Sequence, residues 1–192
     1  MPKAADSFDP RTIIATLERN YVDYVLIGGL AQVLRGADVV TSGVDICPSF
    51  AGDNLARVTA ACRELEARAR DGHPLTFDEA SLMAAPVVKM STTAGQLNVV
   101  GSPAGVPGGY VALRRSATRE DLGHGVRPLV AATGDLATMA AALHREQDRA
   151  RLPMLRRIVE LEVERAPAVA QTPATRSRPQ SRSTTRASRV RS

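Results

Sequence analysis

The feature that most constrains the fold is a short apolar run that ends in two glycines. Residues 24–27 read Tyr-Val-Leu-Ile, Gly28 and Gly29 follow, and residues 30–34 are again mostly apolar. A run of this length, closed by turn formers, suits a buried strand better than a helix. Because glycine adopts backbone conformations that other residues avoid, the pair predicts a tight turn. The segment therefore predicts a strand over 24–27, a turn, and a helix over 30–34.

A second strand, predicted over 44–47, carries an acid among apolar residues. Val44, Ile46 and Cys47 surround Asp45, and a proline ends the run. An ionised carboxylate that is buried without a partner is costly. We therefore expect Asp45 to face a cleft and to be a site residue. Thr41 precedes this strand, and it either bonds a phosphate or only begins the strand.

The chain up to about residue 165 alternates between helical and extended patterns. Asp9 and Pro10 predict a helix start, because Asp caps helices and proline suits the first helical position. Hydrophobic spacing predicts helices over 10–20, 54–70, 111–117, 135–143 and 149–164, and strands over 87–90, 96–100 and 126–131. This order predicts a mixed α/β (α+β) fold. A short mixed sheet is expected to be flanked by helices, with a helical C-terminal part from about residue 135.

Charge and composition separate the C-terminal tail from the rest of the chain. Residues 166–192 hold six arginines, no acid and almost no large apolar residue. The net charge of +5 therefore comes from this tail, and the remainder is close to neutral. Such a segment buries too little apolar surface to offset the entropy of ordering. We expect one domain over 1–165 and a disordered Arg/Ser/Pro-rich tail over 166–192, which either contacts RNA phosphates or has no role.

Other features limit the environment of the protein. The sequence has no apolar run long enough to span a bilayer, and its first residues do not resemble a signal peptide. Cys47 and Cys62 are expected to be buried or half-buried thiols, and the absence of a CxxC motif or a Cys/His cluster argues against zinc. The sequence therefore predicts a cytoplasmic protein with no membrane partner.

Residues 25–31 and 41–46 together resemble the signature of the minimal nucleotidyltransferase superfamily. In that signature a strand ends in a glycine pair at a helix N-terminus, and a second strand carries Asp-x-Asp. Glycines let phosphates approach the backbone, and carboxylates at i and i+2 share one face of a strand. The resemblance extends over residues 10–162. Residues 97–100 and 103–110 are similar to the third-carboxylate strand of the superfamily and the Gly/Pro-rich loop that follows it. Residues 135–155 resemble the C-terminal helix–turn–helix of AbiEii-type proteins, which include the MenT-type toxins of bacterial toxin–antitoxin systems.

The resemblance implies a nucleotidyltransferase fold and a transfer reaction. A nucleoside monophosphate would pass from an NTP to an RNA acceptor, the 3′ end of tRNA, with Mg²⁺ or Mn²⁺ as cofactor and a cognate antitoxin protein as partner. Asp45 would be a catalytic residue and the metal ligand, and Asp148 a second catalytic acid. The candidate nucleotide-binding residues are Gly28, Gly29, Thr41, Lys89 and Arg145.

Several positions depart from the family pattern and leave a second hypothesis open. Gly43 stands where the family has its first Asp, and Asn98 stands where a carboxylate is common. Ala140 and Gln147 stand where lysines are common. The alternative is a catalytically impaired protein of the same fold that binds nucleotide, RNA or a protein partner without turnover. A third hypothesis is an RNA-binding module that acts through the arginine-rich tail.

Overall fold

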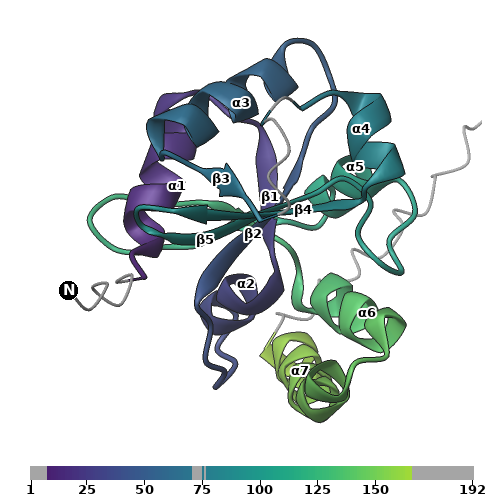
Figure 1. Cartoon of the computed structure of the whole chain (residues 1–192). Coiled ribbons are helices and arrows are strands. Elements are labelled where there is room, and N and C mark those ends of the chain that lie inside the picture. The colour runs from purple at the N-terminus through teal and green to yellow at the C-terminus, as the bar shows by residue number, and fades with distance from the viewer. Residues whose placement is uncertain (1–7, 71–74, 76, 166–192) are drawn as a thin grey trace, which may run out of the picture.

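The computed structural model describes residues 8–70, 75 and 77–165 of the chain. Within these residues seven strands form one mixed sheet in the order β3-β4-β5-β2-β1-β7-β6 (Figure 1). The strands are β1 (Tyr24–Ile27), β2 (Gly43–Pro48), β3 (Arg68–Ala69), β4 (Val87–Thr92), β5 (Gly95–Val100), β6 (Thr118–Arg119) and β7 (Leu129–Val130). The helices are α1 (Pro10–Arg19), α2 (Gly28–Leu34), α3 (Asn54–Glu64), α4 (Glu79–Ala84), α5 (Gly109–Arg114), α6 (Thr133–Leu143) and α7 (Glu146–Arg165). The predicted mixed α/β architecture is confirmed, whereas the predicted disorder over 166–192 lies outside the described residues.

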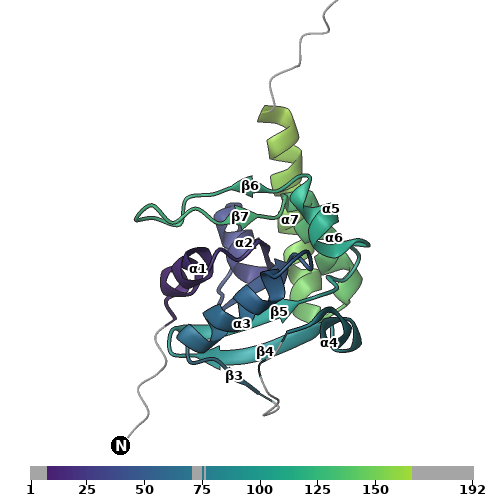
Figure 2. The same ribbon diagram turned by 90° about the horizontal axis from the view of Figure 1, so that it is seen from above.

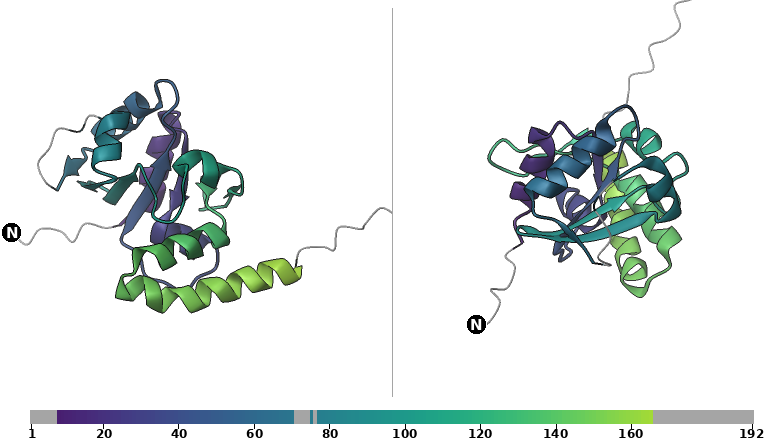
Figure 3. Two further views of the ribbon diagram at one scale, coloured as in Figure 1. Left: turned by 90° about the vertical axis from the view of Figure 1, so that its right-hand side faces the viewer. Right: turned by 45° about the horizontal axis from the view of Figure 1, so that its top comes forward.

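Helices cover both faces of the sheet. In Figure 1, α1 and α3 lie on one face and α2, α6 and α7 on the other, and Figure 3 shows the same layers from the side. β1 is buried along its whole length, as a central strand between two helical layers should be. On α1, Ile13, Ile14 and Leu17 are fully buried. The sheet therefore has a core on both faces, and side chains are accessible where the helices leave a strand end uncovered.

The strand register brings together residues that are far apart in the sequence. β2 pairs antiparallel with β1 and parallel with β5, and β5 pairs antiparallel with β4. Ile27 is aligned with Asp45, Asp45 with Asn98, and Asn98 with Lys89. Because directly paired residues on neighbouring strands point to the same face, the side chains of Asp45, Asn98 and Lys89 share one face of the sheet.

Several predicted boundaries are wrong. α3 ends at Glu64, not at residue 70, because Glu66 adopts a left-handed conformation (φ 50°) and the amide of Ala67 turns back to the carbonyl of Cys62. The strand predicted over 126–131 shrinks to the two residues of β7. α7 begins before residue 149 and continues through Pro153. The sequence thus predicted the main elements but not where each one ends.

One arginine ties the β6–β7 hairpin to α2. Arg35 follows α2 directly, and its guanidinium donates to the carbonyls of Val130 and Ala131. It also pairs with Glu120 at 2.6 Å. Figure 2 shows the hairpin and its loop reaching across the end of α1. The C-terminal end of α2 is thereby fixed to one edge of the sheet.

Two simpler expectations concern the cysteines and the membrane. Cys47 and Cys62 are both buried free thiols, as the sequence predicted. In the part of the chain that the structure describes, no helix combines the length and the apolar character that crossing a bilayer requires.

Candidate functional site

A half-open polar row lies in the first halves of β2 and β5. Gly43 and Asp45 on β2 are half-buried, as are Gln96 and Asn98 on β5, and the residues between them are buried. The register aligns Gly43 with Gln96 and Asp45 with Asn98. The four half-buried positions therefore share one face. This row interrupts the buried apolar residues of β2 and β5 and is the first sign of a site.

The glycine pair makes room for two polar side chains. Gly28 has a φ of +70°, in the left-handed region that favours glycine. A Cβ at position 28 would overlap the carboxylate of Asp45, and a Cβ at position 29 would lie only 2.8 Å from Oγ1 of Thr41. Any larger residue at position 28 would displace the carboxylate. The two glycines, Asp45 and Thr41 therefore pack together at the junction of β1 and α2.

Hydrogen-bond donors surround the carboxylate of Asp45. Nδ2 of Asn98 donates to Oδ1 of Asp45 at 2.7 Å, and the backbone amide of Gly29 also donates to this carboxylate. Burial raises the pKa of Asp45, and these two hydrogen bonds partly oppose the rise because they stabilise the anion. We call the five residues that meet here the Asp45 cluster: Gly28, Gly29, Thr41, Asp45 and Asn98.

Two cations act on this carboxylate from outside the cluster. The positive charges of Arg145 and Lys89 both lower the pKa of Asp45, although burial remains the larger effect. Lys89 is exposed on β4 and is aligned with Asn98. Arg145 lies in the short connection between α6 and α7. The cluster therefore lies in a positive field that comes from two different parts of the fold.

Asp148 holds Arg145 in place. It is the third residue of α7 and is 4% exposed, and its Oδ2 accepts a hydrogen bond from Nε of Arg145 at 2.6 Å. The connection between the helices is tight because His144 adopts a left-handed conformation. An ion pair of this kind leaves the two terminal amino groups of the arginine side chain free to point elsewhere. Asp148 therefore holds one end of Arg145, whose charge lowers the pKa of Asp45.

The hydroxyl of Thr41 contacts the start of β2, and its role in binding phosphate stays a prediction. Its hydroxyl donates to the carbonyl of Gly43 at 3.1 Å, which helps to begin β2. The same hydroxyl oxygen faces Gly29 in the cluster. A phosphate contact at Thr41 would therefore require the hydroxyl to exchange its present partner.

The structure brings most of the predicted site residues together. Gly28, Gly29, Thr41 and Asp45 pack in the cluster, and Lys89 and Arg145 act on it through their charges. The sequence reasoning missed Asn98 as a partner and treated it only as a lost carboxylate. One signal could have found it. Asn98, like Asp45, is a single polar residue within an apolar strand.

The residues around Asp45 do not fit a divalent-metal site. Mg²⁺ prefers an octahedral shell of oxygen ligands, usually one or two carboxylates together with water and phosphates. Asn98 and Gly29 present N–H groups to Asp45, and Gly43 contributes no side chain. Among the residues that the structure describes, no three His, Cys, Asp or Glu side chains lie close enough to hold a metal. The ligand set that the family resemblance implies for Mg²⁺ or Mn²⁺ is thus not present.

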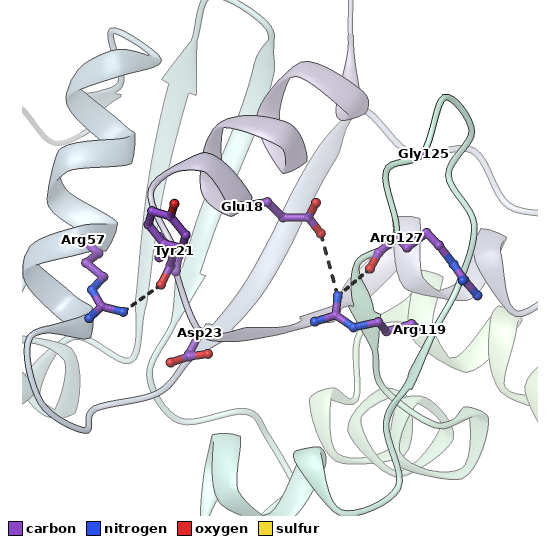
Figure 4. A pocket seen from close by; sticks show the side chains of 8 residues that line it. Glu18, Tyr21, Asp23, Arg57, Arg119, Gly125 and Arg127 are labelled. Atoms are coloured by element: carbon purple, nitrogen blue, oxygen red, sulfur yellow. Dashed lines mark hydrogen bonds and ion pairs between the residues drawn. The ribbon is translucent and has the colours of Figure 1, made fainter.

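A cavity of about 520 Å³ lies away from this cluster. Its lining includes Val22 and Asp23, which precede β1, whereas the cluster follows the end of that strand. Figure 4 shows partners for the side chains of two of its three arginines. Arg57 donates to the carbonyl of Tyr21, and Arg119 lies between Glu18 and the carbonyl of Arg127. The cavity is therefore separate from the candidate site.

Comparisons with known proteins show low similarity. No protein-family model and no curated protein matches the sequence. A Thermotoga maritima protein whose crystal structure is described as that of a nucleotidyltransferase is 14% identical, with a TM-score of 0.45 over 81% of this chain and 91% of that chain. The antibiotic-resistance factor ANT(2'')-Ia, solved in solution, is 13% identical, with a TM-score of 0.44 over 80% of this chain and 92% of that chain. Neither likeness assigns a role to a residue of this chain.

Proposed function

We propose that this chain is a nucleotidyltransferase-like protein that binds the phosphates of a nucleoside triphosphate beside the Asp45 cluster, and that its transfer activity is impaired. One observation carries the proposal. The glycine turn after β1 meets Asp45 and Thr41 at the end of a polar row, to which Lys89 and Arg145 bring positive charge. Small residues, a hydroxyl and two cations are groups that suit phosphate binding.

The proposal of impaired transfer rests on the hydrogen bond between Asn98 and Asp45. Enzymes that transfer phosphoryl or nucleotidyl groups depend on positioning and on neutralising the charge that develops at phosphate. Here Asn98 occupies one oxygen of Asp45, and Gly43 supplies no second carboxylate on that face. The chain retains groups that bind phosphate but lacks the acids that would hold a catalytic metal.

Active transfer is the second candidate function, and the position of Asp45 favours it. Asp45 lies on β2 against the glycine turn, where the family resemblance expects a catalytic acid. In this reaction an acceptor hydroxyl oxygen bonds to the α-phosphorus, the bond to the β-phosphate breaks, and pyrophosphate leaves with the proton passing to solvent. The acceptor would be the 3′ end of tRNA, Asp148 would be a second site acid, and a cognate antitoxin would restrain the protein.

A labelling experiment separates the two candidates. Each α-labelled NTP is incubated with the protein, total tRNA and Mg²⁺ or Mn²⁺, beside the variants Asp45→Ala and Gly43→Asp. Equilibrium binding of the same NTPs is measured in parallel. We expect the parent protein to bind an NTP, to leave tRNA unlabelled, and to lose affinity in Gly29→Val, because valine would clash with Thr41.

Each outcome has a distinct meaning. Label that requires Asp45 would contradict impairment and support active transfer. Label only in Gly43→Asp would show that the missing acid caused the impairment. An absence of NTP binding under all conditions, with the variants folded by circular dichroism, would exclude the proposed function.

A further inference from the structure

The Asp45 cluster does not fit a divalent metal, so a nucleotide bound there, as the proposed function requires, needs another source of positive charge. The triphosphate of a nucleotide carries several negative charges, and a protein that binds it must neutralise part of them. In most nucleotide sites a divalent cation does so together with basic side chains. The cluster contains one carboxylate, and its neighbours present N–H donors to it. The positive charge must therefore come from elsewhere in the chain.

Lys89 is one source of that charge. The register places it one strand beyond Asn98 and two strands beyond Asp45, on the same face of the sheet. Its side chain is exposed, so its ammonium group is free to move along this face. The register therefore places Lys89 beside the polar row, and its charge lowers the pKa of Asp45.

Arg145 is the second source. Its Nε is fixed by the buried Asp148 at 2.6 Å, whereas its side chain as a whole is 54% exposed. This arrangement anchors the guanidinium at one end and leaves donors directed outward, a geometry suited to bidentate contact with phosphate oxygens. Its effect on Asp45 is larger than that of Lys89. Lys89 and Arg145 each carry one positive charge, and the carboxylate of Asp148 balances part of that on Arg145.

We propose that the Asp45 site binds the triphosphate of a nucleotide without a divalent cation, with Lys89 and Arg145 in place of the metal. The binding depends on salt, because it rests on two partly exposed charges. Added Mg²⁺ does not strengthen it, since the metal would pair with the same phosphate oxygens that the two side chains contact.

The test is the dissociation constant of ATP, measured by calorimetry on the full chain in EDTA and again in excess Mg²⁺. We expect equal or tighter binding in EDTA. Lys89→Gln should weaken binding in EDTA roughly fivefold, the effect of about one exposed ion pair. Arg63→Gln is the matched control, because Arg63 is an exposed cation on α3, on the opposite face of the sheet (Figure 1). Its affinity should equal that of the parent.

Two further variants test the contribution of Arg145. Arg145→Lys keeps the charge beside the buried Asp148 but removes the planar guanidinium, and it should weaken binding while the melting temperature changes little. Arg145→Gln removes the charge as well and should weaken binding further.

The results distinguish this inference from the proposed function. Binding that requires Mg²⁺ would overturn the inference and leave the proposed function intact. Binding in EDTA that is unaffected by Lys89→Gln and both Arg145 variants would also overturn it. If ATP, GTP, CTP and UTP bind in neither condition, the proposed function itself fails.

Discussion

At the scale of single residues, the identity of one neighbour determines what Asp45 can do. A carboxylate at position 98 would share a metal with Asp45, whereas the amide of Asn98 donates a hydrogen bond to it at 2.7 Å. The same backbone register would allow either arrangement, because positions 45 and 98 are directly paired. Whether this face forms a metal centre or a metal-free site therefore depends on whether residue 98 presents a hydrogen-bond acceptor or a donor to Asp45.

Restoring the acids should create a metal response that the parent protein lacks. In the double variant Gly43→Asp/Asn98→Asp, three carboxylates would face one another, so the free energy of unfolding should fall without metal because like charges repel. Saturating Mn²⁺ should then restore about 1–3 kcal/mol, the linkage effect of a ligand at 10–100 times its dissociation constant. Thermal melting with and without Mn²⁺ measures both effects.

The control for this prediction is Gly43→Asn. A Cβ at position 43 lies 3.1 Å from Cβ of Gln96, so asparagine imposes the same packing cost without the charge. This variant should melt at a similar temperature with and without Mn²⁺. A parent protein that is stabilised by Mn²⁺ would show instead that the natural residues bind the metal.

The sequence was informative at these positions where the chemistry is local. Gly28 and Gly29 predict a turn because of their residue type, and Asp45 is recognisable as a site candidate because it is charged within an apolar run. The pairing of Asp45 with Asn98 depends on the register between β2 and β5, which are separated along the chain by two helices and two strands. Local patterns carry no information on such a register, so Asn98 was interpreted as a missing carboxylate and not as the hydrogen-bond partner of Asp45.

At the scale of elements, a helix boundary was predictable where a residue of characteristic type marks it. Asp9 caps α1 by accepting from the amides of Arg11 and Thr12, as its type indicated. The end of α3 has no such signal, because Glu66 occupies the left-handed position that glycine normally takes. The two-residue strands β3 and β6 were missed because pairing with β4 and β7, not a local pattern, supports them. The short helix α4 was also missed, although Asp78 caps it by accepting from the amide of Ser81.

Glu66→Gly should therefore stabilise the protein. A non-glycine residue in the left-handed region destabilises the folded state by about 1–2 kcal/mol, and glycine removes this strain. Glycine also gives the unfolded chain more conformational freedom, which cancels part of the gain. We expect a net gain of roughly 0.5–1 kcal/mol in the free energy of unfolding by urea titration. Glu66 is exposed, so few packing contacts change. Glu66→Ala keeps the backbone strain and should show no gain, and an equal gain in both variants would contradict the explanation.

At the scale of the whole molecule, the C-terminal helices belong to the same core as the sheet. Leu136 and Ala140 of α6 and Leu155 of α7 are buried with the residues of β1, β2 and α3 in one hydrophobic cluster. Thr133 at the start of α6 also donates to Glu162 of α7 at 2.7 Å. The helices that carry Arg145 to the site are therefore part of the folded body. The sequence prediction of one domain over 1–165 remains a prediction that unfolding experiments can test.

The substitution Leu155→Ala tests whether α7 and the sheet unfold together. Leu155 is fully buried, and removing most of its side chain should lower the free energy of unfolding by about 2–4 kcal/mol. If α7 and the sheet form one cooperative unit, two signals should shift to the same lower midpoint. These are circular dichroism, which follows the helices, and the fluorescence of Tyr24, which follows the sheet when Tyr21→Phe and Tyr110→Phe remove the other two tyrosines. Val163→Ala is the matched control, because Val163 lies on the same helix but is 70% exposed, and it should change the midpoint little. Two separate transitions in Leu155→Ala would show that α7 unfolds independently, in which case Arg145 would be carried by a mobile element and its contribution to the site would depend on the docking of that helix.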